Sequence, residues 1–458
     1  MTTLRDSSGV SGNSPKIGIS VWLSDPASYK MADQPDIAVI AASEFNEAHP
    51  EYLVEIKAHD FRTMPAIVAE AAEKGTPPDV AEFHFTMTRT MIDALGSDGA
   101  PLFAPIDRAI AGRTEILGEP VVLDSMLPAA RDYFRYAGEL TSIPRTASTL
   151  VLYANMTILN RAGVAEPPRT WREVEAACEA VAELSDGPSH RIAWPNCYWF
   201  FLQSVAQQGG LIADHDNGRS ARPEKVDFAS DEMMAYVEWW QRLHRNGHYL
   251  YTGVPVDFLG CFEAFENQQV ALLITSSVDA THLMQRGERH GFTVKASRMP
   301  YNDEVRYAGN SMGGFSLWLA SGLSKEKQDG ALAFMQYLNN PRNAAEWAKL
   351  HWRIPITKPS IEVLGGEDWF ARNPNLRPAS DQADASDCSP ASLGPLMGDH
   401  AAIVGELTAA MHDVLLNDAE PTARFASASK EAQQTLEAYN SYCDGPPRRT
   451  PRDYTVSI

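Results

Sequence analysis

Apolar residues along the first hundred positions follow two alternating periods, one typical of strands and the other of helices. The predicted order is strand, helix, strand, helix, strand, at residues 16–23, 37–49, 52–56, 64–74 and 79–85. Pro50 and Gly75 follow the two helices, as expected for residues that end a helix. This alternation predicts an α/β fold with a doubly wound sheet, in which ligands bind beyond the carboxyl ends of the strands.

Residues 144–171 form the most informative part of the pattern. A β-branched run from Thr146 to Tyr153 predicts a strand, and a helix-like turn after it ends at Gly163. A proline pair and Thr170 then predict the start of a new helix.

The remaining pattern continues to alternate between the two periods. Helices are predicted at residues 170–184, 199–209, 231–246, 261–267, 325–338, 341–350, 401–415 and 421–439. Strands are predicted at residues 270–277, 292–299 and 313–320. Residues 360–398 are rich in Pro, Asp, Ser and Gly, which predicts a long irregular region.

Composition limits the classes of protein that remain. With 458 residues the chain predicts two or more domains, and 44% hydrophobic with 21% charged residues is typical of a soluble globular protein. The net charge of -20 argues against nucleic acid as a partner, because a polyanion needs a basic surface. The five cysteines are scattered and lack a C-x-x-C pair, so we expect reduced thiols or at most one or two disulfides. The apolar runs are too short to span a bilayer.

The two ends of the chain are polar. Residues 1–15 contain no apolar stretch of the kind a secretory signal needs, which leaves two alternatives. The protein acts outside the cytoplasm and a leader is missing from this sequence, which we favour, or it stays in the cytoplasm. We expect residues 1–15 to be disordered and residues 441–458 to form a flexible tail.

Motifs of common enzymes are missing from the sequence. It contains no G-x-x-x-x-G-K-[ST], H-E-x-x-H or G-x-S-x-G, and no G-x-G-x-x-G after a strand. Asp214, His215 and Asp216 precede Asn217 and Gly218, so a turn is a better explanation than a cation site. We therefore predict a protein that is not an enzyme, with no cofactor and no metal.

Short blocks in a fixed order carry a family resemblance. They are Trp22 with Ser24, F-N-E-A-H-P at 45–50, P-P-D-V at 77–80, the 144–171 segment, F-E-N-Q-Q-V-A-L-L-I-T-S-S at 265–277, M-P-Y at 299–301, G-G-F-S-L-W-L at 313–319, P-R-N-A-A-E-W at 341–347 and R-I-P-I-T at 353–357. Together they resemble the extracellular solute-binding proteins (family 1) of ABC importers for sugars and glycerol phosphates, in particular the glycerol-3-phosphate-binding members.

The resemblance implies a two-lobe periplasmic-binding-protein fold of type II, with discontinuous lobes, a hinge and a ligand cleft between them. The implied division is 16–143 plus 279–314 for one lobe and 144–278 plus 315–440 for the other. Three crossings are expected near residues 143–150, 275–281 and 312–318. Binding would favour a closed form that a membrane permease recognises.

The resemblance also implies site residues, position by position. Phe83 and His84 match a Tyr-Glu pair, Asn196 and Trp199 match two tryptophans, and Gly313 and Gly314 match a glycine pair whose amides approach the ligand. Trp22, Trp199 and Trp352 lie in loops where aromatic rings would stack on a sugar. The complete expected set is Trp22, Asp25, His84, Arg145, Ser148, Asn196, Trp199, Ser277, Gly313, Gly314, Trp352 and Arg353.

One position departs from the glycerol-phosphate pattern. Those relatives have an arginine where this chain has Leu396, and Asp399 follows shortly after. Losing a guanidinium removes a strong phosphate donor, although Arg145 and Arg353 could partly compensate. We therefore expect a monomer that binds a carbohydrate, as a mono- or oligosaccharide or a sugar-like polyol, and delivers it to ABC permease subunits. The alternatives are a glycerophosphate or glycerophosphodiester receptor and a cytoplasmic enzyme or sensor that reuses the fold.

Overall fold

The computed structural model describes residues 15–25 and 37–444. The predicted disordered segment 1–15 and flexible tail 441–458 therefore lie almost entirely outside the described residues. Residues 441–444 are an exception, because they complete the last helix, α20 (Pro421–Asp444), and so do not belong to a flexible tail.

Lobe 1 is built on a mixed sheet with the strand order β2-β1-β3-β15-β4, and β9 also pairs with β15. Strand β1 runs parallel to β2 and β3, whereas β15 is antiparallel to β3, β4 and β9. Its elements are β1 (Ile17–Ser24), α1 (Ile37–Ala48), β2 (Tyr52–His59), α2 (Met64–Glu73), β3 (Val80–His84), η2 (Phe85–Met87), α3 (Thr88–Asp93), β4 (Phe103–Ala104), α4 (Ile106–Ile110), β5 (Glu115–Ile116), β6 (Glu119–Pro120), η3 (Leu123–Ser125), α5 (Pro128–Asp132), β7 (Arg135–Tyr136), β8 (Glu139–Leu140), β9 (Ile143–Ser148), β15 (Gly313–Ala320), α13 (Lys325–Leu338), α14 (Pro341–His351), α15 (Lys358–Gly366) and α16 (Trp369–Arg372).

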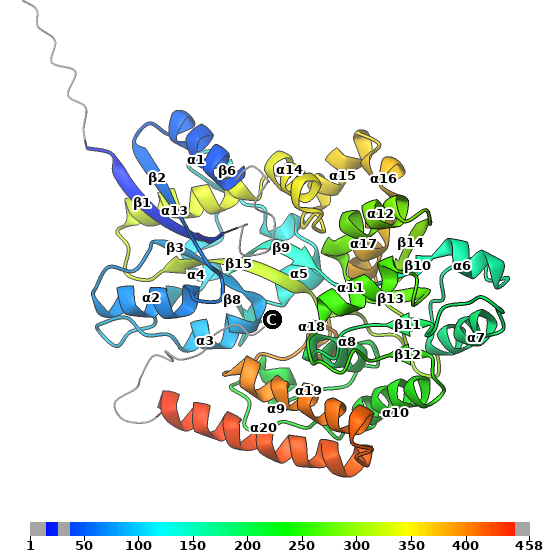
Figure 1. Ribbon diagram of the computed structural model, residues 1–458. Helices are drawn as coiled ribbons and strands as arrows, with labels where there is room; N and C mark the ends of the chain where they lie inside the picture. Colours follow the sequence, from blue (N-terminus) through cyan, green and yellow to red (C-terminus); the bar gives the residue numbers. More distant parts are fainter. Residues whose placement is uncertain (1–14, 26–36, 445–458) are drawn as a thin grey trace, which may run out of the picture.

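Lobe 2 is built on a second sheet with the order β12-β11-β13-β10-β14. Figure 1 shows the two lobes side by side, with α20 along one edge of the molecule. The elements of lobe 2 are β10 (Leu150–Asn155), α6 (Met156–Arg161), α7 (Trp171–Ala182), β11 (Ile192–Ala193), α8 (Tyr198–Gln207), α9 (Asp214–Gly218), α10 (Asp231–Arg245), β12 (Tyr249–Leu250), α11 (Phe258–Glu266), β13 (Leu272–Ser276), η4 (Ser277–Asp279), α12 (Ala280–Arg289), β14 (Val294–Arg298), η5 (Pro374–Leu376), α17 (Arg377–Asp384), α18 (Pro390–Leu393), α19 (His400–Leu416) and α20.

Tryptophan side chains fill much of the core of lobe 2. Trp171 stacks on Trp239 with ring centroids 5.0 Å apart, and Trp194 also stacks on Trp239, at 5.6 Å. Trp240 is completely buried beside Trp194. Burying such large apolar rings stabilises the lobe, which explains much of the tryptophan content without a ligand.

The segment 144–171 folds as its pattern predicts, except that the predicted strand is divided into two strands in different sheets. The β-branched run becomes β9 in the first sheet and β10 in the second, and the chain changes lobe at Thr149. Helix α6 follows, Gly163 adopts a positive φ of 78°, and the Thr170 side chain caps α7 by accepting from the Glu173 amide.

The expected crossing near residues 312–318 lies close to an observed passage, because β14 lies in lobe 2 and β15 begins in lobe 1 at Gly313, whereas the expected crossing at residues 275–281 is wrong. The chain does not cross at residues 275–281, because β13 continues through η4 and α12 to β14, which pairs with β10 in the same sheet. It crosses between β14 and β15, and again between α15 and α17.

The strand pairing therefore differs from the expected division of the chain into lobes. Part of the 279–314 segment, including β14, lies in lobe 2, and β15 with α13 lies in lobe 1. The apolar patterns of β14 and β15 suit a strand in either sheet, so sequence alone did not assign them correctly.

The expectation of a long irregular region at 360–398 is also wrong. This region contains α16, α17, α18, the short 3-10 helix η5 and most of α15. Prolines occupy the first turns of α15, α17 and α18. Proline is well tolerated there because the amide it lacks would have no partner inside the helix.

Candidate functional site

The two lobes meet around Gly313, the first residue of β15. Gly313 pairs with Ser148 at the end of β9. A Cβ at Gly313 would lie 3.0 Å from Trp199 Cζ2, 3.3 Å from Ser148 Oγ and 3.4 Å from Phe85 Cε1. Trp199 comes from α8 of lobe 2 and the other residues from lobe 1, so this glycine marks a close contact between lobes.

An aromatic cluster surrounds this contact. The Phe85 ring centroid lies 6.4 Å from Trp199, 6.4 Å from His400 and 5.6 Å from Tyr133. Tyr198, next to Trp199 at the start of α8, lies 5.5 Å from the His400 ring. We call Phe85, Tyr133, Tyr198, Trp199 and His400 the interlobe aromatic cluster.

Two polar atoms of the interlobe aromatic cluster are buried without a partner among the described residues. These are Trp199 Nε1 and His400 Nε2. Burial lowers the pKa of His400 to about 4, so its imidazole is neutral at pH 7 and offers one donor and one acceptor. A buried polar atom without a hydrogen bond is costly, and a ligand hydroxyl near these two groups would remove that cost.

His84 lies at the end of β3, beside the cluster. Its ring packs 4.5 Å from Phe85 and 5.1 Å from Phe315, and its Nδ1 lies 2.8 Å from Thr86 Oγ1. Burial, followed by the positive potential of His400 and Arg353, lowers the His84 pKa to about 3. His84 is therefore a neutral group with one ring nitrogen already engaged.

Ser277 and Asn196 lie near the cluster but already have partners. Ser277 and Thr149 exchange hydrogen bonds, since Ser277 Oγ accepts from the Thr149 amide at 3.2 Å and the Ser277 amide donates to the Thr149 carbonyl at 2.8 Å. Asn196 is completely buried, and its Nδ2 donates to the Thr408 carbonyl at 2.8 Å, whereas its Oδ1 is buried without a partner among the described residues. Both residues hold the surroundings of the cluster in place.

The expected arginines occupy charged surroundings on the lobe 1 side. Arg145 Nη1 donates to Glu82 Oε1 at 2.6 Å, and its guanidinium lies 3.8 Å from the Trp347 ring centroid. The charge of Arg353 contributes to the lowered pKa of His84 and opposes the rise in the pKa of Asp279. Burial nevertheless raises the Asp279 pKa to about 6, and Thr275 Oγ1 donates to its carboxylate at 2.8 Å.

Four expected residues have other surroundings. Trp22 packs against His59 at 4.9 Å, and the Asp25 amide donates to the His59 carbonyl at 2.8 Å, so both lie at the ends of β1 and β2. Trp352 stacks on Trp369 at 5.6 Å. A Cβ at Gly314 would lie 2.0 Å from the Thr146 carbonyl oxygen, so pairing of β15 with β9 alone accounts for this glycine.

Four residues of the interlobe aromatic cluster are not among the expected site residues: Phe85, Tyr133, Tyr198 and His400. Phe85 directly follows His84, and Tyr198 directly precedes Trp199, so extending the expected positions by one residue would have found both. His400 follows the altered stretch that contains Leu396, whose side chain is buried in the core. Tyr133 has no comparable signal in the sequence.

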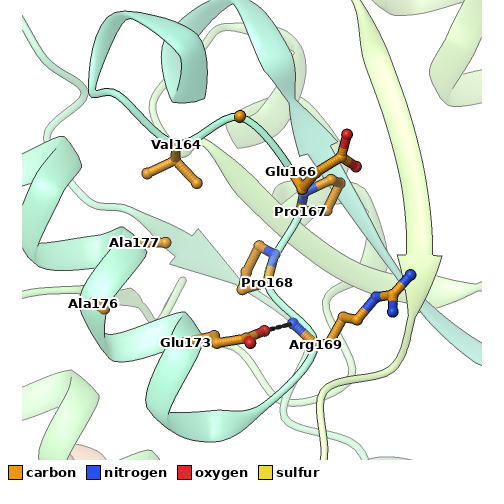
Figure 2. A pocket seen from close by; sticks show the side chains of 9 residues that line it. Val164, Glu166, Pro167, Pro168, Arg169, Glu173, Ala176 and Ala177 are labelled. Carbon is orange, nitrogen blue, oxygen red and sulfur yellow. Dashed lines mark hydrogen bonds between the residues drawn. The ribbon is translucent and has the colours of Figure 1, made fainter.

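A separate surface hollow of about 610 Å³ lies on lobe 2, between residues 164–169 and α7 (Figure 2). Two of the residues that line the hollow are connected by a hydrogen bond from the Arg169 amide to Glu173 Oε2 at 2.7 Å. None of the expected site residues lines this hollow. It is a feature of the turn that leads into α7.

Asp214, His215 and Glu224 place ligand atoms close together on the surface of lobe 2. The carboxylate of Asp214 accepts hydrogen bonds from the amides of Glu224 and Lys225, at 2.8 and 3.1 Å. His215, Asp216 and Asn217 all have positive φ. These contacts support the predicted turn.

The family is shown by a match along most of the chain. The model of the family described as bacterial extracellular solute-binding proteins matches residues 41–378. The chain belongs to this family. Its members are the solute-binding components of ABC importers, so a small-molecule solute and the importer's permease are the partners of such a protein.

Relatives and solved structures agree with this assignment. The sn-glycerol-3-phosphate-binding periplasmic protein UgpB of Salmonella typhimurium is 25% identical over 349 residues, which cover 74% of this chain and 76% of that protein. The cyclic α-maltosyl-1,6-maltose binding protein of Arthrobacter globiformis aligns with a TM-score of 0.73 at 17% identity, covering 93% of this chain and all of that one.

A second similar structure is UgpB of Mycobacterium tuberculosis in complex with glycerophosphocholine. It aligns with a TM-score of 0.66 at 17% identity, over 93% of this chain and 99% of that one. At such low identity the likeness of the two solved structures shows the fold alone. It confirms the predicted two-lobe α/β architecture of this solute-binding protein.

Members of this family work outside the cytoplasm, and binding rather than catalysis is their role. Within residues 15–25 and 37–444, no helix is both long and apolar enough to cross a membrane. The five cysteines are free, and all but Cys388 are buried.

Proposed function

We propose that this protein captures a carbohydrate or a sugar-like polyol between its two lobes and delivers it to a membrane permease. The observation that carries the proposal is the interlobe aromatic cluster with its two unpartnered polar atoms, Trp199 Nε1 and His400 Nε2. Aromatic faces bind the C–H surface of a sugar, and neutral donors and acceptors bind its hydroxyls. His84, Ser148 and the backbone at Gly313 complete the proposed site.

The charges around the site favour an uncharged solute. Arg145 is paired with Glu82, Arg62 lies 3.5 Å from Asp60, and Arg353 interacts with Asp279. A phosphate is usually bound by cations or amides that are not already neutralised by carboxylates. The position at which glycerol-phosphate relatives have an arginine holds Leu396, and that side chain is buried.

The competing proposal is a glycerophosphodiester as the solute. It is motivated by the sequence relative that binds sn-glycerol-3-phosphate and by the structural relative in complex with glycerophosphocholine. Arg353 would then be the residue that contacts the phosphate. The two proposals differ in ligand charge, so one experiment separates them.

The deciding experiment is a thermal-shift panel of maltose, maltotetraose, glucose, glycerol, sn-glycerol-3-phosphate and glycerophosphocholine. A bound ligand raises the melting temperature by mass action, by an amount that grows with its concentration over Kd. We expect one or more neutral sugars or polyols to raise it, and the phosphorylated compounds to leave it unchanged. A shift with phosphorylated compounds alone would contradict the carbohydrate proposal.

We further propose that the protein acts as a monomer on the outer side of the cytoplasmic membrane and does not bind nucleic acid. Its net charge of -20 opposes binding to a polyanion. Light scattering after size-exclusion chromatography checks the mass against the 50.3 kDa of one chain. Fractionation of the source cells checks the location, and recovery in the cytoplasm would favour a sensor or enzyme instead.

A further inference from the structure

A buried carboxylate joins the two lobes at the end of α3, away from the proposed solute site. The Asp93 side chain is 4% exposed and is paired with Arg89 on the same helix. Asp93 also accepts a hydrogen bond from Arg222 Nη2 at 2.6 Å and one from the Tyr439 hydroxyl at 2.9 Å. Arg222 and Tyr439 belong to lobe 2, and Figure 1 shows the end of α20 next to α3.

A second arginine, only three residues before Arg222 in the sequence, makes a parallel connection. The Arg219 guanidinium is buried and donates to the carbonyl of Tyr133 in lobe 1 at 2.7 Å and to that of Gly394 in lobe 2 at 2.7 Å. The Ala137 amide of lobe 1 donates back to the Arg219 carbonyl at 2.7 Å. The segment from Arg219 to Arg222 is thus fixed to both lobes.

Both interlobe connections are linked to Phe85 of the interlobe aromatic cluster, one through Tyr133 and the other through helix α3. The Tyr133 hydroxyl donates to the Phe85 carbonyl at 3.2 Å. Helix α3 begins at Thr88, whose hydroxyl donates to the same carbonyl at 2.7 Å, and ends at Asp93. A displacement of Asp93 would therefore be transmitted to Phe85, which faces Trp199 across the lobes.

We propose that Asp93, Arg222 and Tyr439 form an interlobe latch that stabilises the arrangement in which the solute site is assembled. Asp93 is a positioning residue in this proposal and does not touch the solute. When the latch is broken, Asp93 stays buried between the lobes with fewer hydrogen-bond partners, which is costly. If the lobes separate, water can solvate this carboxylate and the cost is removed. Breaking the latch therefore favours separation of the lobes. The solute then binds more weakly because the competent arrangement is less populated.

The test measures the lobes directly, without any solute. Small-angle X-ray scattering of the full chain gives the radius of gyration of the wild type, of Arg222→Met and of Arg222→Lys. We expect a larger radius for Arg222→Met and a return toward the wild-type value for Arg222→Lys, which keeps the positive charge. Arg242→Met is the matched control, because Arg242 pairs with Glu175 at 2.8 Å inside lobe 2.

A merely structural role gives a different result. The melting temperature would then fall in Arg222→Met while its radius of gyration stays equal to that of the wild type, and this outcome would overturn the latch. If Arg222→Met does not fold, Tyr439→Phe decides, since it removes one hydroxyl and is expected to increase the radius by a smaller amount. An unchanged radius in Tyr439→Phe would then overturn the proposal. Because no solute is used, the result is independent of the carbohydrate proposal.

Discussion

Trp199 is the side chain on which the proposed site depends most. It packs against the apolar core of lobe 2 and lies 6.4 Å from the Phe85 ring of lobe 1, and its Nε1 has no partner among the described residues. We expect Trp199→Ala to weaken binding of the sugar identified in the thermal-shift panel by about 1–3 kcal/mol, through lost apolar burial and stacking. Isothermal titration calorimetry measures the change.

The matched control for this variant is Trp171→Phe in the stacked core of lobe 2. It should lower the melting temperature and leave the affinity within about twofold, because the ring lies inside a single lobe. Trp352→Ala is expected to have a smaller effect on affinity than Trp199→Ala, because Trp352 stacks on Trp369. Equal affinities for Trp199→Ala and the wild type would show that the solute binds elsewhere.

Buried histidines make the stability of the fold depend on pH. The pKa of His400 is lowered to about 4 by burial, against about 6.5 in an unfolded chain. Between these values the unfolded chain binds the extra proton, so stability falls as the pH drops from about 6.5 toward 4. For His400 alone the loss between pH 7 and pH 5 is about 2 kcal/mol.

Urea unfolding at pH 7 and pH 5 checks this prediction. The difference in unfolding free energy between the two pH values should be smaller in His400→Gln than in the wild type. His290→Gln, at an exposed position after α12, is the control and should keep the full difference. If the difference in unfolding free energy between pH 7 and pH 5 is the same in His400→Gln as in the wild type, the pKa of His400 is not lowered in the folded protein.

Part of the site was predictable at the residue scale and part was not. His84, Ser148, Trp199 and Gly313 do lie around one contact between the lobes. Trp199 and Gly313 begin predicted elements, whereas His84 and Ser148 lie within predicted strands. Trp22 also lies at the carboxyl end of its strand, but β3 separates β1 from β15. The strand order that moves Trp22 away from Gly313 depends on long-range pairing, which a sequence pattern does not contain.

At the scale of elements, strand β15 depends on a glycine that packing requires. Gly314 has a φ of 140°, and a Cβ there would lie 2.0 Å from the Thr146 carbonyl oxygen. We expect Gly314→Ala to destabilise the fold by about 3 kcal/mol or more, since the paired backbone of β9 cannot move aside cheaply. Chemical denaturation followed by circular dichroism measures the loss.

Gly365 offers the matched control in helix α15. A Cβ there meets nothing within 4 Å, so Gly365→Ala should leave stability unchanged or raise it by up to about 1 kcal/mol. If Gly314→Ala proved as stable as Gly365→Ala, the pairing of β15 with β9 would be looser than the structure indicates.

The predicted elements succeeded where a periodic pattern was long and failed where the elements were short. Helix α13 (Lys325–Leu338) has the predicted bounds, and α10 differs by one residue at its end. In contrast, α17 is short and contacts both β14 and α5. Because a helix of this length is marginal on its own, its stability comes from tertiary packing. The proline in its first turn is part of the Pro-, Asp-, Ser- and Gly-rich composition that predicts an irregular region.

At the scale of the whole molecule, the two-lobe fold was predictable, whereas the path of the chain between the lobes was predictable only in part. The crossing at Thr149 lies in the expected range 143–150, which the family resemblance implies, although the β-branched run alone does not show where the chain passes from one sheet to the other. The second crossing lies after β14 because that strand pairs with β10 as the edge of the lobe 2 sheet. Either sheet offered an edge to this strand, and only the folded chain shows which one it joined.

Movement of the lobes should be visible in the intrinsic fluorescence of the protein. Trp199 packs against both lobes, whereas Trp171, Trp194 and Trp239 are stacked inside lobe 2 and would move with it as one body. Adding the sugar found in the panel should therefore change the emission of the wild type, because the surroundings of Trp199 change when the lobes close. Trp199→Phe keeps an aromatic face for the sugar and should lose most of the change.

Trp22→Phe is the control for this experiment, since Trp22 packs against His59 inside lobe 1 and should contribute little to the signal. Calorimetry on each variant confirms that the sugar still binds. If Trp199→Phe binds the sugar and keeps the full change in emission, closure does not alter the surroundings of Trp199. The contact around Gly313 would then be a fixed part of the hinge, and the solute would have to lie farther out between the lobes.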